Sequence, residues 1–144
     1  IRLLPRARPF PGNIGNCFMT FAQSLTAAAR LTEATLERIL SEKTLAGDAP
    51  DPQSGRLIAA MRHAVLGGGK RVRPLLVIES AALFDVPANS AALTAAALEL
   101  VHCYSLAHDD LPAMDNDELR RGLPTVWKAY DEWTAVLAGD GLLT

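Results

Sequence analysis

The sequence has only two cysteines, Cys17 and Cys103, among its 144 residues. Two distant cysteines cannot build the disulfide framework of a small secreted domain, and they lack the spacing of a zinc site. An excess of one charge is also missing, because 14 basic and 16 acidic side chains leave a net charge of −2. This balance excludes a general affinity for nucleic acid, so anion binding has to come from local clusters. We expect a protein of the reducing cytoplasm.

Long apolar runs are absent as well. The longest runs, 75–78 and 95–98, are far shorter than the roughly 20 residues of a membrane-spanning helix, so no membrane contact is expected. A hydrophobic fraction of 49% still predicts a folded domain. Residues 1–18 differ from the rest, since they carry three prolines, no initial Met and no apolar periodicity. We predict that 1–18 is an extension outside the fold and that the domain comprises residues 19–144.

The sequence also lacks the patterns that are typical of β-strands. Apolar and polar residues do not alternate for long, and the one Asp-Gly pair, at 140–141, ends a helical run. Apolar residues recur instead at helical spacing, which predicts an all-α fold. The predicted helices are 20–45, 56–66, 74–84, 91–111 and 125–138. Asn89 or Ser90 is expected to cap the fourth helix, and Thr125 the fifth.

The stretch HDDLPAMDNDELRRG, residues 108–122, collects five acids directly before two arginines. Carboxylates without cysteine suit a hard cation such as Mg²⁺, which makes Asp109, Asp110 and Asp115 candidate ligands. On an ideal helix Asp109 and Asp115 are about 600° apart and do not share a face. Pro112 distorts the turn between them and can bring the third carboxylate round to the first.

Other interpretations of the acidic stretch stay open or fail. A solvated acidic helix end explains the cluster equally well when the stretch is considered alone. A calcium loop that starts at Asp115 fails, because Leu119 and Arg120 occupy its fifth and sixth positions. A carboxylate pair that acts as acid and base is disfavoured, because neighbouring arginines hold both groups ionised.

The segment GGGKRVRP, residues 67–74, places three cations behind three glycines. It does not match the P-loop pattern GxxxxGK[ST], because Arg71 follows the lysine. Glycines and cations at a helix start favour anion binding through backbone N–H groups and the helix dipole.

His102 lies seven residues before Asp109, nearly on the same helix face, although a single histidine is more often a core or surface residue. Carboxylates and arginines together fit a polyanion held through Mg²⁺ and by Arg, and the separate basic segment suggests a second diphosphate.

The segments GGGKRVRPLL and HCYSLAHDDLPAMDNDELRRGLPTVWKAYDEWTAVLAGDGLLT resemble the trans-isoprenyl diphosphate synthases, closest to the bacterial farnesyl diphosphate synthase group. The resemblance covers residues 19–144. It implies the amino-terminal helices of a helical bundle of the isoprenoid synthase type. It also implies a homodimeric, Mg²⁺-dependent prenyltransferase that condenses isopentenyl diphosphate with dimethylallyl or geranyl diphosphate to give farnesyl diphosphate.

The resemblance further implies roles for individual residues. Asp109, Asp110 and Asp115 match the first aspartate-rich motif, which binds Mg²⁺ and through it the allylic diphosphate. Arg120 matches the arginine that holds the same diphosphate. The residues that match the isopentenyl diphosphate pocket are Lys70, Arg73, His102 and Arg121. Tyr104 and Ser105 match the positions that set product length, and an aromatic residue at 104 fits a fifteen-carbon product.

The sequence departs from the family pattern at three places. Asn116 stands where close relatives often have Asp, and Trp127 stands where many have His, with no effect that the sequence reveals. The chain also ends at Thr144, before the second aspartate-rich motif, so we expect a fragment with exposed helix faces that is inactive alone. Two alternatives remain, a non-catalytic homologue that regulates a full-length synthase and a geranylgeranyl diphosphate synthase. A terpene cyclase is not expected to carry the segment GGGKRVRP.

Overall fold

The structure of this protein is a computed structural model that describes residues 19–47 and 52–144. The predicted extension 1–18 lies outside the described residues. Within these ranges the helices are α1 (Phe21–Ile39), α2 (Glu42–Ala46), α3 (Pro52–Leu66), α4 (Val72–Ala82), α5 (Ala88–Asp109), α6 (Val126–Ala129) and α7 (Glu132–Leu143). Between α5 and α6, two short strands pair antiparallel, β1 (Leu119–Arg120) and β2 (Leu123–Pro124). The all-α prediction is confirmed, with this small hairpin as an addition.

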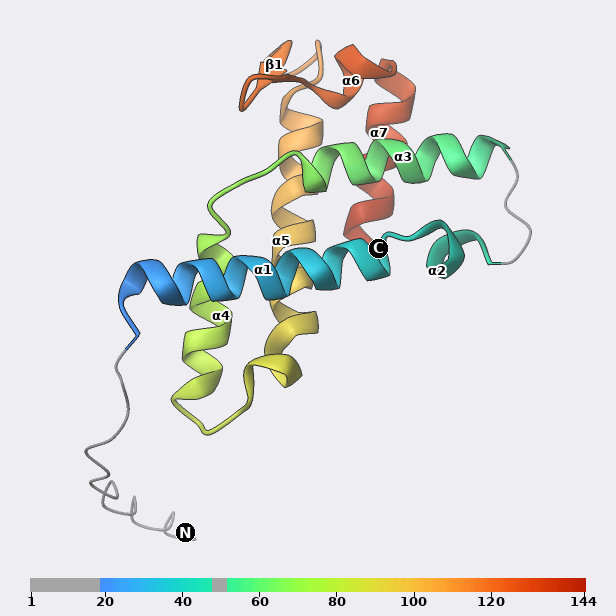
Figure 1. Ribbon diagram of the computed structural model, residues 1–144. Helices are drawn as coiled ribbons and strands as arrows, with labels where there is room; N and C mark the ends of the chain where they lie inside the picture. The colour runs from blue at the N-terminus through green and yellow to red at the C-terminus, as the bar shows by residue number, and fades with distance from the viewer. Residues whose placement is uncertain (1–18, 48–51) are drawn as a thin grey trace, which may run out of the picture.

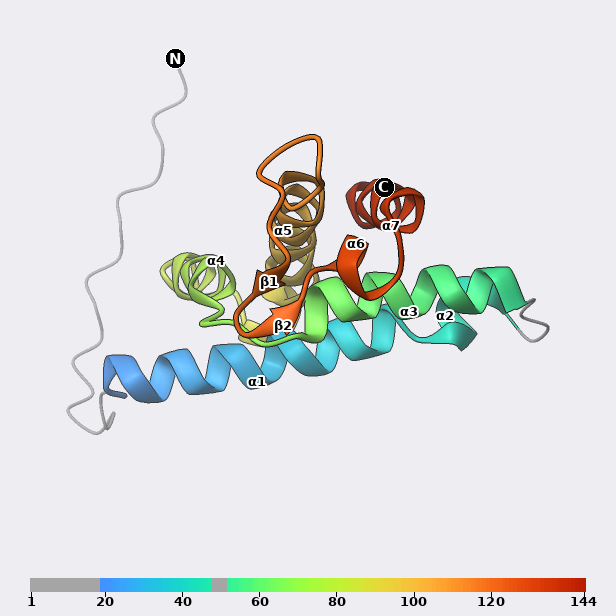
Figure 2. The ribbon, with the colours of Figure 1, turned by 90° about the horizontal axis from the view of Figure 1, so that it is seen from above.

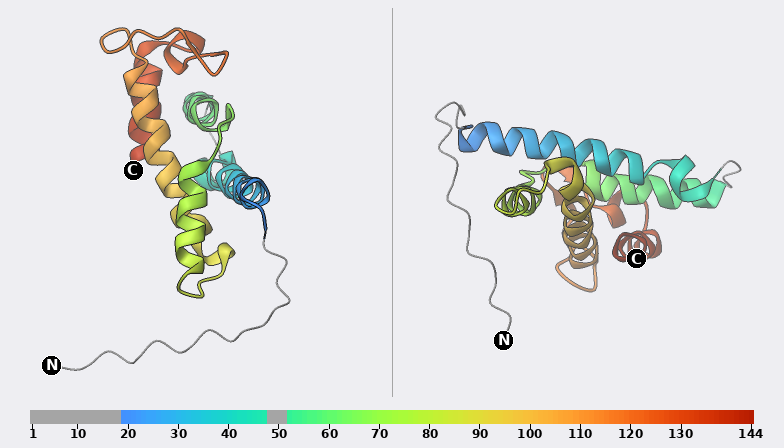
Figure 3. Two further views of the ribbon diagram at one scale, coloured as in Figure 1. Left: turned by 90° about the vertical axis from the view of Figure 1, so that its left-hand side faces the viewer. Right: turned by 90° about the horizontal axis from the view of Figure 1, so that it is seen from below.

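The helices form two layers that cross each other (Figure 1). α4, α5 and α7 lie side by side with α5 in the middle, and α1 and α3 run across them on one face (Figures 2 and 3). α5 contacts α1, α3, α4 and α7, which makes it the central helix. The acidic stretch and the hairpin continue from the carboxyl end of α5, so the central helix fixes where they lie.

The first predicted helix, 20–45, is divided into α1 and α2. A capping box starts α1, in which the Thr20 hydroxyl accepts from the Gln23 amide and the Gln23 side chain accepts from the Thr20 amide. The chain leaves the helix after Ile39, and the Ser41 side chain accepts from the Thr44 amide to cap α2. Ser41 stops the continuous helix because it supplies a new amino-terminal cap.

Two further boundaries differ from the prediction. α3 begins at Pro52, where proline fits a first helical turn, so the loop before it is shorter than expected. α5 begins at Ala88 after Pro87, and no side chain caps it. Asn89 and Ser90 lie inside the helix, so the cap predicted there is wrong. Proline fixes its own φ at a helix entry, and the alanines that follow favour continuation of the helix.

The last predicted helix, 125–138, is also divided, into α6 and α7. The Asp131 carboxylate accepts from the Thr134 amide at 2.8 Å and caps α7. Thr125 precedes α6, but its hydroxyl donates to the Asp117 carbonyl at 2.8 Å rather than capping the helix. Thr125 therefore occupies the cap position of α6 as predicted, but its side chain makes no capping bond, because the acidic loop engages that hydroxyl.

The core consists of two clusters of buried apolar side chains that both touch α5. One cluster, between α1, α3, α5 and α7, contains the fully buried Leu36 and Val65. The other, around Ala95, joins α1, α4 and α5. Burial of a side chain such as Leu36 stabilises the fold by about 1.5–3 kcal/mol. At Gly139 on α7, a Cβ atom would lie 2.1 Å from His108 Nε2, so the glycine allows α5 and α7 to approach closely.

Apolar side chains are exposed on the outer helix faces, as expected from the sequence. Examples are Leu76 on α4, Leu93 on α5 and Trp133 on α7. Within the described segments, α5 is the one helix that is long and apolar enough to cross a membrane by length and composition alone. The central helix of a bundle meets the same criterion, and α5 packs against four other helices.

Candidate diphosphate-binding site

The acidic stretch folds back on itself directly after α5. The Asp115 amide donates to the Asp109 carbonyl at 2.8 Å, and the Asn116 amide donates to the Leu111 carbonyl at 3.0 Å. The turn passes through Pro112, and Asn116 has a left-handed φ of 56°, which asparagine tolerates better than most residues. The expectation that a distorted turn brings the third aspartate back to the first is confirmed for the backbone.

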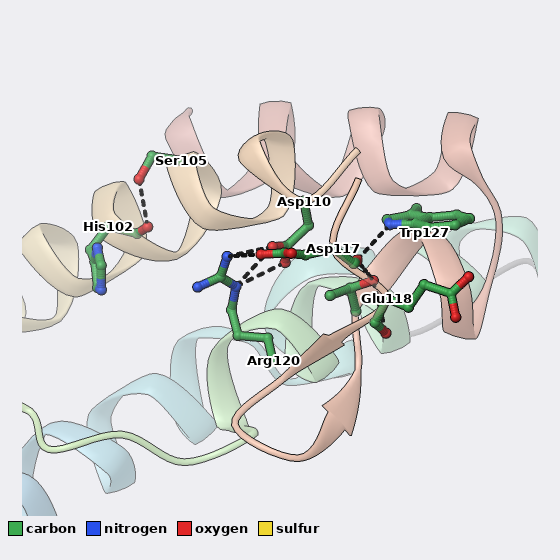
Figure 4. Close-up of polar contacts among 8 residues, drawn as sticks. His102, Ser105, Asp110, Asp117, Glu118, Arg120 and Trp127 are labelled. Carbon is green, nitrogen blue, oxygen red and sulfur yellow. Dashed lines mark hydrogen bonds and ion pairs between the residues drawn. The ribbon is translucent and has the colours of Figure 1, made fainter. Parts of the chain in front are cut away.

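The three aspartates have different surroundings. Asp110 is only 3% exposed and accepts hydrogen bonds from Arg120 Nε at 2.9 and 3.0 Å and from Arg120 Nη2 at 2.5 Å. Arg120 Nη2 also lies 3.5 Å from an Asp117 oxygen (Figure 4). The bonds to Asp110 raise the pKa of the Arg120 guanidinium, so it stays charged. Within the described ranges, the half-buried Asp109 and the exposed Asp115 have no side-chain partner.

These carboxylates determine how a metal fits. No group of three His, Cys, Asp or Glu side chains in residues 19–47 and 52–144 is arranged to hold an ion. Asp110 is occupied by Arg120, and binding a metal there requires the loss of part of that ion pair. The side-chain carboxylates of Asp109 and Asp115 are free, and a backbone hydrogen bond holds these two residues next to each other. Mg²⁺ binds through one or two carboxylates while it retains water. Those two residues fit Mg²⁺, and the predicted set of three stays a prediction.

The hairpin after the acidic stretch directs two consecutive arginines to different partners. Arg121 and Gly122 form its turn with positive φ angles of 55° and 79°, the conformation that tight hairpins require. Arg120, on β1, turns to Asp110, while Arg121 Nη1 donates to the Gly68 carbonyl. A Cβ atom at Gly69 would lie 2.7 Å from Arg121 Nη1. The glycine-rich segment therefore lies directly against the second arginine.

The basic segment separates its three cations. Lys70 and Arg73 are exposed, and neither makes a hydrogen bond or ion pair within the part of the chain that the structure describes. Arg71 is only 2% exposed, with a left-handed φ of 51°, and its side chain turns into the protein. Two of the three cations are thus available to an anion, and they are the two predicted from the sequence.

His102 completes this cationic group from α5. Burial lowers the pKa of its imidazole, and the charge of Arg73 lowers the pKa further. Arg121 and Arg120 act in the same direction, and Glu99 opposes them. The structure therefore brings His102, Arg73 and Arg121 within electrostatic range of one another, and Arg121 reaches the loop that precedes Lys70. Their roles toward a substrate stay predictions.

The two residues predicted to set product length lie one turn before the aspartates. The Tyr104 ring packs edge-on against the His108 ring, with centroids 5.8 Å apart. His108 Nε2 lies 3.0 Å from the Val136 carbonyl, so this ring pair connects α5 to α7. The Ser105 hydroxyl donates within its own helix, to the carbonyl three residues earlier. The Tyr104 ring thus packs against His108 and the core, whereas the Ser105 hydroxyl is engaged within its own helix.

Residues after the hairpin secure the acidic loop, and sequence reasoning missed them. Trp127 Nε1 donates to the Asp117 carbonyl at 2.9 Å, beside the bond from Thr125 (Figure 4). Lys128 forms an ion pair of 2.8 Å with Glu118. The tryptophan whose effect the sequence did not reveal therefore holds the loop in place. An indole ten residues from its acceptor gives no local signal that could have predicted this bond.

A cavity of about 40 Å³ lies under the hairpin, and its lining includes His63, Gly67, Cys103, Asp110 and Arg120. This volume holds a few water molecules and no prenyl chain. Burial raises the pKa of the Cys103 thiol to about 11, so the thiol stays protonated at neutral pH. The cavity is packing space behind the arginines, and Cys103 is not an activated nucleophile.

An all-α bundle that groups free cations and carboxylates at the end of its central helix defines a domain of the isoprenoid synthase type. The polyprenyl synthetase family model matches residues 55–144. The chain therefore belongs to the polyprenyl synthetase family.

Individual relatives agree with this assignment. Farnesyl diphosphate synthase of Escherichia coli (strain K12) is 44% identical over 127 residues, which are 88% of this chain and 40% of that protein. Geranylgeranyl pyrophosphate synthase of Catharanthus roseus chloroplasts is 55% identical over 84 residues, 58% of this chain and 24% of that protein.

A solved geranyltransferase from Legionella pneumophila has a TM-score of 0.74 at 47% identity, covering 85% of this chain and 40% of that one. The solved FPP/GFPP synthase of Zymomonas mobilis has a TM-score of 0.72, and the match covers 85% of this chain and 42% of that one. The chain spans between about a quarter and two fifths of the length of these relatives.

Proposed function

We propose that the protein to which this chain belongs is a Mg²⁺-dependent prenyltransferase that joins isopentenyl diphosphate to an allylic diphosphate. The observation that carries the proposal is the contact of Arg121 with Gly68, because it brings the arginines of the hairpin against the segment that carries the free cations Lys70 and Arg73. One cationic group contains Lys70 and Arg73, and the other lies at the aspartates. A reaction between two diphosphates needs two such anion sites side by side.

The allylic diphosphate is assigned to the acidic side. Arg120 is held by Asp110 and stays 32% exposed, so its outer donors remain available to an oxyanion. Asp109 and Asp115 would hold Mg²⁺, which when bound supplies positive charge that neutralises the diphosphate. Arg120 stabilises negative charge on the leaving diphosphate as the allylic C–O bond breaks and the diphosphate keeps the electron pair.

Isopentenyl diphosphate is assigned to the basic side. Lys70, Arg73, His102 and Arg121 hold its diphosphate and orient the alkene toward the allylic carbon. The alkene electrons form the new C–C bond, and a proton is then lost to the released diphosphate. The residues of this group bind and orient, which is how proximity accelerates a reaction between two bound substrates.

Farnesyl diphosphate is the proposed product, formed in the cytoplasm by a homodimer. The aromatic side chain of Tyr104, five residues before Asp109, supports this product, because a bulky ring at that position would limit the length of a growing chain. A geranylgeranyl product is the alternative, since several plant relatives are named for it. The product length of the variant Tyr104→Ala tests this proposal. A longer product than that of the parent protein supports the steric role of the ring. Unchanged product length contradicts it.

The proposal is tested with protein made from the complete reading frame that contains this chain. Radiolabelled isopentenyl diphosphate and geranyl diphosphate are supplied with Mg²⁺ or with EDTA, and prenyl products are separated by length. We expect condensation that depends on Mg²⁺. Binding without turnover would favour a regulatory homologue, and metal-independent binding of the allylic substrate would exclude Asp109 and Asp115 as bridging ligands.

A further inference from the structure

Arg71 is the one cation of the basic segment that does not face outward. Its Nη1 donates to Glu99 Oε1 at 2.7 Å, and its Nη2 donates to the Val65 carbonyl at 2.7 Å. Its Nε lies 3.7 Å from a Glu33 oxygen. Both partners of the Arg71–Glu99 ion pair are buried, with side chains 0% and 3% exposed.

These contacts connect the helices around the glycine-rich segment. Val65 is in the last turn of α3, where a cation also offsets the negative end of the helix dipole. Glu99 belongs to the middle of α5 and Glu33 to α1, while Arg71 itself precedes α4. The guanidinium therefore ties the end of α3, the start of α4 and the central helix at one point.

This junction fixes both ends of the segment that carries the exposed cations. Residues 67–70 lie between Val65, which accepts from Arg71, and Arg71 itself. The left-handed conformation of Arg71 sends its side chain inward, while Lys70 before it and Arg73 after it stay exposed. A non-glycine residue in this conformation is strained and persists only where its surroundings hold it. The ion pair to Glu99 supplies that support.

The same pair also sets the distance between the loop and α5. Glu99 lies one helical turn before His102, so the loop is fastened to the helix beside the histidine of the cationic group. Lys70 and Arg73 have no partners of their own within the described residues. Their positions relative to His102 therefore depend on the backbone that Arg71 anchors.

We propose that Arg71 and Glu99 are positioning residues for the isopentenyl diphosphate site, an inference that rests on the proposed function. They do not touch substrate. They hold the backbone of Lys70 and Arg73 at a fixed distance from His102, and they leave the allylic site at the aspartates unaffected. A displacement of about 1 Å at a binding group is enough to weaken its action strongly.

The test compares three variants in the protein from the complete reading frame. Arg71→Lys keeps the positive charge, but a single ammonium group cannot reproduce the planar guanidinium that donates to Glu99 and to the Val65 carbonyl at the same time. The double variant Arg71→Met/Glu99→Leu removes both charges, so no unpaired ion is left buried. Arg62→Lys is the matched control, because Arg62 also donates to backbone carbonyls, those of Glu37 and Leu40, away from the site.

Steady-state kinetics with each substrate varied in turn distinguishes positioning from general support of the fold. We expect Arg71→Lys and the double variant to raise KM for isopentenyl diphosphate at least about fivefold, with KM for geranyl diphosphate within about twofold of the parent. Arg62→Lys should change neither. Equal effects on both KM values, or no effect on either, would overturn the proposal. Melting temperatures measured alongside show whether each variant is folded.

Calorimetry with inorganic diphosphate separates failure of this inference from failure of the proposed function. If the parent protein does not condense the two substrates, the proposed function fails, and binding of inorganic diphosphate without Mg²⁺ becomes the measurement. Weaker binding by Arg71→Lys, with Arg62→Lys unchanged, still supports the positioning role. Equal binding by the parent and Arg71→Lys overturns it.

Discussion

The basic segment 67–74 and the hairpin each contain an arginine paired with a carboxylate in or directly after α5, yet the two pairs differ in exposure. The pair of Arg71 and Glu99 is shut off from solvent. The pair of Arg120 and Asp110 has a buried carboxylate and an arginine that is 32% exposed. An arginine whose donors are all enclosed cannot touch a substrate and acts only through the residues that it holds, whereas one with an exposed side can also bind an anion itself.

This difference shows how one residue type acquires two roles. Each pair fastens a loop to α5, the first to its middle and the second to its carboxyl end. The first loop then presents neighbouring cations, and the second presents its own paired arginine. The distinction predicts that removing a carboxylate costs mainly stability at the first pair and mainly binding at the second.

The largest effect is expected from Glu99→Leu, which leaves Arg71 as an uncompensated buried charge. We expect a loss of about 3–5 kcal/mol in the free energy of unfolding, measured by urea denaturation. The double variant Arg71→Met/Glu99→Leu should recover much of this loss, because it leaves no unpaired charge. A single variant as stable as the parent would contradict the view that the enclosed pair supports the fold.

The next effect concerns α5 itself, to which both pairs are attached. Gly139→Ala places a Cβ atom 2.1 Å from His108 Nε2, so the His108 ring has to leave its place between α5 and α7 or the helices have to shift. We expect a loss of about 1–3 kcal/mol in unfolding free energy, with both binding sites disturbed together. Gly141→Ala is the matched control, since its Cβ meets the flexible Met61 side chain at 3.2 Å. Similar losses in the two variants would show that close helix approach at His108 is unimportant.

Asp110→Asn sharpens the comparison at the exposed pair. The amide can keep one hydrogen bond to Arg120 but loses the charge, so we expect a loss of about 1–2 kcal/mol in unfolding free energy. KM for the allylic diphosphate should rise, while KM for isopentenyl diphosphate stays unchanged. If Asp110 instead binds the metal directly, Mg²⁺ affinity will fall as strongly as in Asp109→Asn and Asp115→Asn, and calorimetry with Mg²⁺ decides between these outcomes.

The smallest effect is the titration of His102. Burial, then Arg73, lowers the pKa of its imidazole below 6.5, so the folded protein favours the neutral form. The contribution of His102 to the free energy of unfolding is constant above pH 6.5 and falls as the pH drops below it, because the unfolded chain takes up this proton first. Arg73→Gln should raise the pKa of His102, measured by NMR, and Arg38→Gln on α1 should not. An unchanged pKa in Arg73→Gln would place the two charges too far apart to interact.

Much of the fold and the grouping of the site could be predicted from the sequence. Apolar periodicity predicts the helices, and glycines end α3 where the sequence indicates. The residues Lys70 and Arg73 stand out because cations after glycines form a local pattern. Arg71 belongs to the same pattern, and its inward direction could not be predicted. Its partner Glu99 is 28 residues away.

The features that could not be predicted from the sequence have the same physical origin. The hairpin is stabilised by the contact of Arg121 with Gly68, 53 residues away, and of Arg120 with Asp110, 10 residues away. Thr125 occupies the cap position of α6, yet its hydroxyl donates to the Asp117 carbonyl eight residues earlier instead of accepting a hydrogen bond from the helix. Local propensity describes what each residue can do, and tertiary contacts decide between those options.

The consecutive arginines of the hairpin have a consequence for how the two anions bind. Arg120 and Arg121 sit on one short, stiff turn and reach toward opposite neighbours, so any tilt of that turn moves both. An anion that pulls on either arginine therefore changes the affinity of the other pocket by a small factor, no larger than the margin of about twofold allowed above for the unaffected KM. Thermodynamic linkage makes this cooperativity reciprocal, with the first-bound molecule changing the second's affinity by the same factor whichever arrives first.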